Sequence, residues 1–169
     1  MLYRTLMFMS RVACHTPRPV LLALGWVLGN LYYLIIAKMR RRAVAHMMPA
    51  LGIDEAAAKK LVRASFINMA RNFLDILAMP MLNESNFRDY IEIDHLERMQ
   101  EALAEGHGVV VLTGHIGCWE WLSAAFTLNG MPVSAIAKPQ PNIQYTRVLD
   151  DLRATIHVEI FSRGTSELI

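Results

Sequence analysis

The chain has 169 residues, a formal net charge of +2, 54% hydrophobic residues and 19% charged residues. It is long enough for one modest domain and too apolar for a disordered chain. The first 42 residues hold seven basic residues and no acidic one, whereas the remainder holds ten basic residues against 15 acidic ones. A basic front before an acidic body does not favour nucleic-acid binding; it favours a cationic segment held against anionic lipid headgroups.

The first predicted element is an apolar helix over residues 20–37. This stretch of 18 residues carries no charge, contains Trp26, Tyr32 and Tyr33, and is followed by a basic cluster at residues 38–42. A signal peptide and a buried core helix are two alternatives, but the length of the run and its aromatic and basic flanks favour a membrane anchor. Because the denser basic cluster follows the helix, the C-terminal body is predicted on the cytoplasmic side.

A second helix is predicted from Asp54 to Pro80. Asp54 is a suitable N-cap, and the ring of Pro80 prevents the helix from continuing. Apolar residues recur on this helix at spacings of three and four, which predicts one stripe packed against the domain. The stripe consists of Val62, Phe66, Met69, Phe73 and Ile76.

Beyond Tyr90, short apolar runs alternate with helical segments. The predicted strands are residues 91–93, 109–113, 133–137 and 158–161, and the predicted helices are residues 95–105, 119–129, 142–155 and a first turn at 165–169. The continuous apolar run at 109–113 is expected to be buried on both faces. This alternation predicts an α/β fold with a mixed, largely parallel sheet flanked by helices. We expect it to be incomplete at the C-terminus, because the chain stops inside the pattern.

The residues that suggest chemistry lie between Gly106 and Trp121. His115 follows the predicted strand, and Glu120 follows five residues later at the start of a helix. A histidine can act as the base that removes a proton from a hydroxyl nucleophile, and a carboxylate fixes its tautomer. The amides of residues 116–118 could bind the oxyanion of an acyl-transfer intermediate. A structural histidine and a nucleophilic Cys118 are the alternatives, and none of this chemistry requires a metal or a cofactor.

The run GVVVLTGHIGCWEW, together with the apolar helix and basic cluster upstream, resembles the bacterial lipid A biosynthesis acyltransferases, a family that includes lauroyl and myristoyl transferases. The typical family segment reads Gly-His-Phe-Gly-Asn-Trp-Glu. The matching positions are Gly114, His115, Gly117, Trp119 and Glu120. Ile116 and Cys118 depart from it. Residues 152–164 resemble a further family segment, except that His157 stands where glycine is usual.

The resemblance implies an enzyme of the bacterial inner membrane that moves a fatty acyl chain from acyl carrier protein to a hydroxyl of a lipid A precursor, at the cytoplasmic face. It implies His115 as general base with Glu120 as its partner. Gly117 and Arg163 would bind substrate, with Arg163 directed at a phosphate of the acceptor.

Under this interpretation, residues 1–42 are the membrane anchor and its basic flank. Residues 43–169 are the N-terminal part of a longer acyltransferase domain. Two alternatives remain open. In the first, the acceptor is another glycolipid or phospholipid. In the second, the chain is an inactive truncated fragment that only binds membrane.

Overall fold

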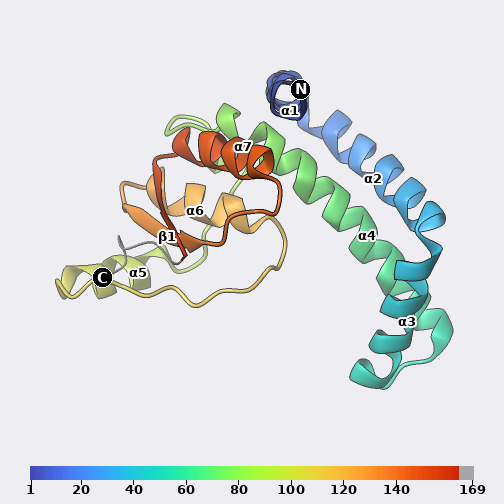
Figure 1. Ribbon diagram of the computed structural model, residues 1–169. Helices are drawn as coiled ribbons and strands as arrows, with labels where there is room; N and C mark the ends of the chain where they lie inside the picture. Colours follow the sequence, from blue (N-terminus) through green and yellow to red (C-terminus); the bar gives the residue numbers. More distant parts are fainter. Residues whose placement is uncertain (164–169) are drawn as a thin grey trace. The chain divides into compact units, whose positions relative to one another are not determined.

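The computed structural model describes residues 1–163 and divides them into two compact units (Figure 1). One unit consists of residues 5–78, and the other combines residues 1–4 with residues 79–163. The fold is mostly helical, and its one described sheet is a parallel pair of strands. The predicted α/β fold is therefore confirmed only in part.

The unit of residues 5–78 is built from helices. They are α1 (Leu2–Cys14), α2 (Arg18–Ile35), α3 (Ala37–Leu51) and α4 (Glu55–Ala78). The predicted N-cap is confirmed, because the Ala57 amide donates a hydrogen bond to Asp54 Oδ1 at 2.8 Å. The predicted end of the helix is confirmed as well, since Pro80 lies in a single 3₁₀ turn, η1 (Met79–Met81), that follows α4.

Helices α2 and α4 pack closely because α2 presents glycines to α4. A side-chain carbon added at Gly29 would lie 2.4 Å from the Ile67 Cα, and one added at Gly25 would lie 2.6 Å from the Arg71 Cγ. Glycine is therefore required at both positions for this approach. An apolar cluster that includes Val44 from α3 and Val62 from α4 lies nearby.

The predicted apolar stripe of α4 is only partly buried. Val62 and Phe66 are buried, but Met69 and Phe73 are 50% and 45% exposed. Toward the end of the helix the buried positions include Leu74 and Leu77 instead. The contact with α2 explains this shift, since the α2 glycines meet the backbone of α4 at Ile67 and Arg71 instead of the predicted stripe.

The second unit contains the sheet. Its elements are η2 (Phe87–Asp89), α5 (Leu96–Ala104), α6 (Trp119–Thr127), β1 (Val133–Ala137), α7 (Ile143–Ala154) and β2 (Val158–Ser162). Strands β1 and β2 pair in parallel, with Val133 opposite Val158, and α7 is the crossover between them. Helix α6 contacts both strands, and α7 contacts β2. Asn142 caps α7 by accepting a hydrogen bond from the Gln144 amide.

Two predicted strands are wrong. Residues 91–93 and 109–113 have no strand structure, and Val110 and Leu112 are 97% and 99% exposed. An apolar run has the propensity to form a strand, but a strand exists only where a neighbour supplies hydrogen bonds. Within residues 1–163 the only strand pairing is between β1 and β2. The helix turn predicted at 165–169 lies outside the described residues.

Candidate active site

The motif between Gly106 and Trp121 ends in the first turn of α6. This helix begins at Trp119, and Glu120 is its second residue. Glu120 is one of the few charged residues that are buried, with 6% of its surface exposed. A carboxylate in the first turn of a helix is favoured by the helix dipole, but its burial requires further hydrogen-bond donors.

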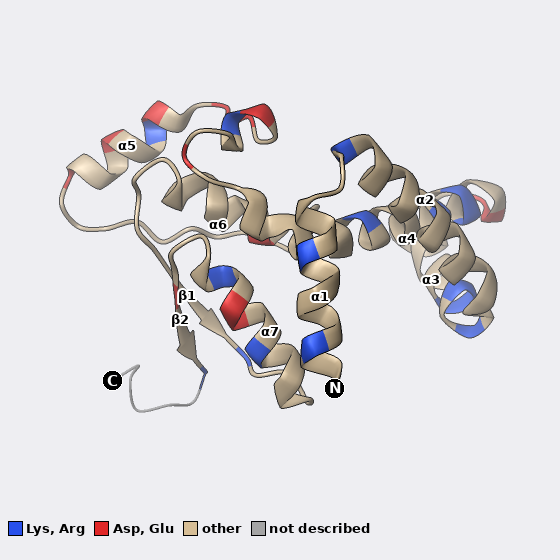
Figure 2. Ribbon diagram, turned by 90° about the horizontal axis from the view of Figure 1, so that it is seen from above, with Lys and Arg blue, Asp and Glu red and all other residues tan. Residues whose placement is uncertain are grey.

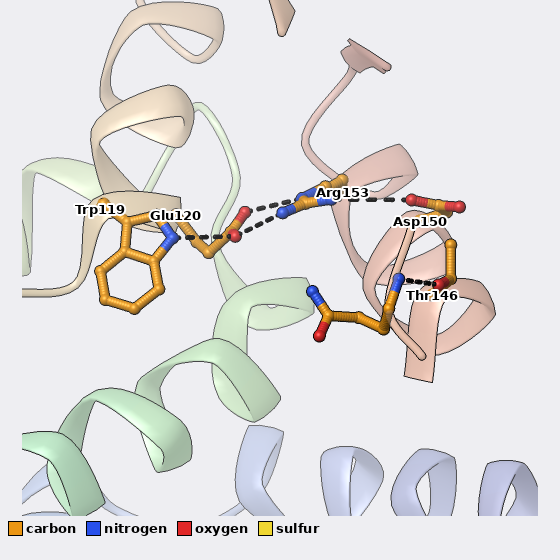
Figure 3. A network of polar contacts seen from close by, with 6 residues as sticks. Trp119, Glu120, Thr146, Asp150 and Arg153 are labelled. Carbon is orange, nitrogen blue, oxygen red and sulfur yellow. Dashed lines mark hydrogen bonds and ion pairs between the residues drawn. The ribbon is translucent and has the colours of Figure 1, made fainter. Parts of the chain in front are cut away.

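Arg153, in the last turn of α7, supplies most of those donors. Its Nε donates to Glu120 Oε2 at 2.8 Å, and its Nη2 donates to Glu120 Oε1 at 2.6 Å (Figure 3). The indole Nε1 of Trp119 donates to Oε1 at 3.2 Å. The pair is a two-pronged ion pair between side chains that are only 16% and 7% exposed. It fixes the position and rotamer of the Glu120 carboxylate.

The same contacts perturb Arg153. The hydrogen bonds to Glu120 raise the pKa of the Arg153 guanidinium above its ordinary value, and burial opposes them only in part. Asp150, one turn earlier on α7, adds a weaker ion pair with its Oδ1 3.6 Å from Arg153 Nη1. Arg153 therefore remains a cation at every pH at which a protein is assayed.

His115 lies beside this network without being bonded to it. Its side chain is exposed, and its ring centroid is 4.6 Å from that of Trp119, in a tilted arrangement. Within residues 1–163 the structure records no hydrogen bond between His115 and Glu120. Trp119 thus connects the two residues, since one indole contacts the imidazole and donates to the carboxylate.

In the turn between His115 and α6, not every backbone amide is open to an oxyanion. The Ile116 amide donates to the Gly114 carbonyl oxygen at 2.8 Å, so this donor is already engaged. Gly117 has a φ of +60°, which is a conformation that glycine adopts without strain. This glycine allows the chain to turn from the exposed segment into α6.

Arg163 takes no part in the Glu120 network. It follows β2 directly, its side chain is exposed, and its amide donates to the Ala137 carbonyl oxygen at 2.9 Å. Arg163 therefore stands at the carboxyl end of the parallel pair, where ligands are bound in many α/β proteins.

Sequence reasoning did not single out Arg153 as a residue of the site. The structure makes it the main partner of Glu120 across a sequence separation of 33 residues. The only local signal was an arginine in the last turn of a helix, and this pattern equally suits a solvated residue at the negative end of the helix dipole.

A comparison with known protein families gives a match over nearly the whole chain. Residues 3–168 match the model of the bacterial lipid A biosynthesis acyltransferase family. The chain belongs to this family and is accordingly an acyltransferase, an enzyme that requires an acyl donor and a lipid acceptor. No curated protein matches the chain.

Proposed function

We propose that the chain is a membrane-bound O-acyltransferase that moves a fatty acyl chain from acyl carrier protein to a hydroxyl of a lipid A precursor. The family match over residues 3–168 supports the class of reaction. The observation that supports the site is the buried carboxylate of Glu120, held by Arg153 and joined through Trp119 to His115.

In this proposal His115 acts as the general base. The acceptor hydroxyl attacks the carbonyl carbon of the acyl thioester, and His115 takes the hydroxyl proton as the new C–O bond forms. The tetrahedral intermediate then breaks its C–S bond. The imidazolium of His115 returns the proton to the leaving sulfur, so that the base is regenerated and the products are an ester and a thiol.

Glu120 stabilises the His115 imidazolium once residues 106–118 bring the ring within hydrogen-bond distance of the carboxylate. Each carboxylate oxygen can accept two hydrogen bonds. Oε1 accepts from Arg153 and Trp119, whereas Oε2 accepts only from Arg153 Nε among the bonds recorded in the described chain. Oε2 therefore retains capacity for the His115 ring, and a rotation of the segment before α6 would supply it. Catalytic hydrogen bonds are often completed only when substrate is bound.

The remaining substrate contacts are assigned by position. Gly117 gives the acyl thioester close access to the backbone beside His115, because it has no side chain. Arg163 binds a phosphate of the acceptor at the carboxyl end of β2, because its guanidinium is exposed and matches phosphate geometry.

The membrane part of the proposal rests on α2. This helix is the one candidate in the described chain that is long and apolar enough to cross a membrane. Helices α1 to α3 carry only basic charges, which appear as blue patches in Figure 2. These features support a location at the bacterial inner membrane, with residues 43–169 as the catalytic part on the cytoplasmic side.

The test measures transfer from radiolabelled acyl–acyl carrier protein to a lipid A precursor in membranes that contain the chain. His115→Ala is expected to lower the rate by about 10²–10⁴-fold, the usual contribution of a general base. His107→Ala is the matched control, since His107 is an exposed histidine in the same segment. Equal transfer by wild type and His115→Ala would refute the assignment of the base. Transfer to a different lipid would change the proposed acceptor but leave the proposed mechanism unchanged.

A further inference from the structure

Helix α2 is bound along its whole length to α4, and the two helices run antiparallel (Figure 1). Arg18 at the start of α2 pairs with Asp75 of α4 in a two-pronged ion pair. Near the other end, Asn30 Oδ1 accepts a hydrogen bond from Arg63 Nε at 2.6 Å. Between these points Gly29 lies against the backbone of Ile67.

This pairing conflicts with a transmembrane arrangement. An 18-residue helix is about 27 Å long, close to the thickness of a bilayer core. If α2 crossed the membrane, the part of α4 from Arg63 to Asp75 would cross beside it. This part includes Arg71, whose backbone packs against Gly25 and whose Nε donates to the Leu22 carbonyl oxygen at 3.3 Å. Arginine and aspartate are among the residues least favoured in the hydrocarbon core.

The opposite face of α2 is apolar and exposed. Leu21, Gly25 and Gly29 form the buried side. Six apolar residues at helical spacing form a face that points away from α4 and are each 45–66% exposed, namely Leu24, Val27, Leu28, Leu31, Leu34 and Ile35. A helix with one face fixed to protein and one apolar face open is suited to an interface between water and acyl chains.

Basic residues flank this apolar helix along the chain. The helices α1, α2 and α3 contain seven basic residues and no acidic one. Four of the seven, Lys38, Arg40, Arg41 and Arg42, follow α2 at the start of α3. Such a cluster attracts anionic headgroups, and the complementarity selects an anionic lipid surface over a protein partner.

We propose that α2 lies in the cytoplasmic leaflet of an anionic membrane, with its exposed apolar face toward the acyl chains and both of its ends on the cytoplasmic side. This inference depends on the membrane part of the proposed function and is independent of the acyl-transfer chemistry.

The test is the topology of single cysteines in the full chain, expressed in a bacterial host. Cys14 and Cys118 are replaced by serine, and a cysteine is placed before α2 (His15→Cys) or after α3 begins (Ala45→Cys), both at exposed positions. A membrane-impermeant maleimide is added to intact spheroplasts and to permeabilised ones. We expect the protein in the membrane fraction, with neither cysteine labelled until the spheroplasts are permeabilised.

Labelling of either cysteine in intact spheroplasts would overturn the proposal, because at least one end of α2 would then lie outside. Recovery of the wild-type chain in the soluble fraction would also overturn it, and a dimer there would mean that a second copy covers the face. The double variant Leu24→Glu/Leu31→Glu should move most of the chain to the soluble fraction, whereas Ala45→Glu should not. Retention of the double variant in membranes would exclude this face as the lipid contact.

These outcomes are separable from the acyl-transfer assay. If the chain is inactive but shows the expected labelling, the proposed membrane arrangement stands and the proposed chemistry is refuted. If the chain is active but is labelled from outside, the proposed chemistry stands and the proposed membrane arrangement is refuted.

Discussion

Replacing Arg153 with methionine removes the main partner of a buried carboxylate. Methionine keeps the apolar stem of the side chain, so the substitution chiefly deletes the guanidinium and its two bonds to Glu120, at 2.8 and 2.6 Å. Loss of one member of a buried ion pair costs about 3–5 kcal/mol, since the other charge stays desolvated. Arg153 is 16% exposed and Glu120 only 7%, so some water can reach the gap, and we expect about 3 kcal/mol, the lower end of that range.

Thermal unfolding of the chain in one detergent measures this cost. For a chain of this size, 1 kcal/mol shifts the Tm by about 2–4 °C, so Arg153→Met should lower it by roughly 6–12 °C. Asp150→Asn is the matched control. Its carboxylate is 45% exposed and 3.6 Å from Arg153, so the expected loss is below about 1 kcal/mol.

A double-mutant cycle with Glu120→Gln separates the pair from general effects of the substitution. The neutral amide should tolerate the loss of Arg153 better, which gives a coupling energy of at least about 1 kcal/mol. Equal shifts for Arg153→Met and Asp150→Asn, or strict additivity in the cycle, would refute the role assigned to this ion pair.

Three further predictions follow from backbone conformation, packing and titration. His157 has a φ of +58°, so His157→Gly should raise the Tm by about 2–4 °C through relief of about 1 kcal/mol of strain; an unchanged or lower Tm would contradict this. Gly29→Ala should lower the Tm, because the added Cβ would lie 2.4 Å from the Ile67 Cα. The overpacking costs about 1–3 kcal/mol and outweighs the gain in helix propensity of about 1 kcal/mol. A higher Tm would show that the two helices can move apart. The hydroxyl of Tyr3 donates to Asp151 Oδ2 at 2.5 Å, and this bond raises the pKa of Tyr3 above 10.0. The bond therefore stabilises the fold below pH 10, and this stabilisation is lost as the pH rises through the folded-state pKa of Tyr3. The measurement is the difference between the tyrosinate absorbance titrations of wild type and Tyr3→Phe, whose midpoint should lie above pH 10. A midpoint at or below pH 10 would exclude this effect.

The conformation of His157 also explains why glycine is usual at this position in the family pattern. The resemblance places glycine where this chain has His157, and the structure gives that position a left-handed backbone. Glycine adopts this conformation without strain, whereas histidine does not. A family preference that was only a sequence pattern thereby acquires a physical reason.

Local sequence determined the helices and the parallel crossover. Caps such as Asp54 and Asn142 and the stop at Pro80 act within one helical turn, so their effect can be predicted without the rest of the fold. The same holds for β1, α7 and β2, where a helical segment lies between two short apolar runs. Two strands connected by such a helical crossover pair in parallel.

Only the tertiary structure decided which groups meet. The apolar run at residues 109–113 has strand composition, yet it is exposed because strand formation depends on a neighbour that the run itself cannot specify. Glu120 was predicted as the partner of His115, and folding adds Arg153, from another helix, as the residue that holds both of its oxygens. The face of α2 that is buried was likewise fixed by its contact with α4. Periodicity and capping are properties of neighbouring residues, whereas ion pairs, sheet partners and the buried or exposed face of a helix depend on residues brought together only by folding.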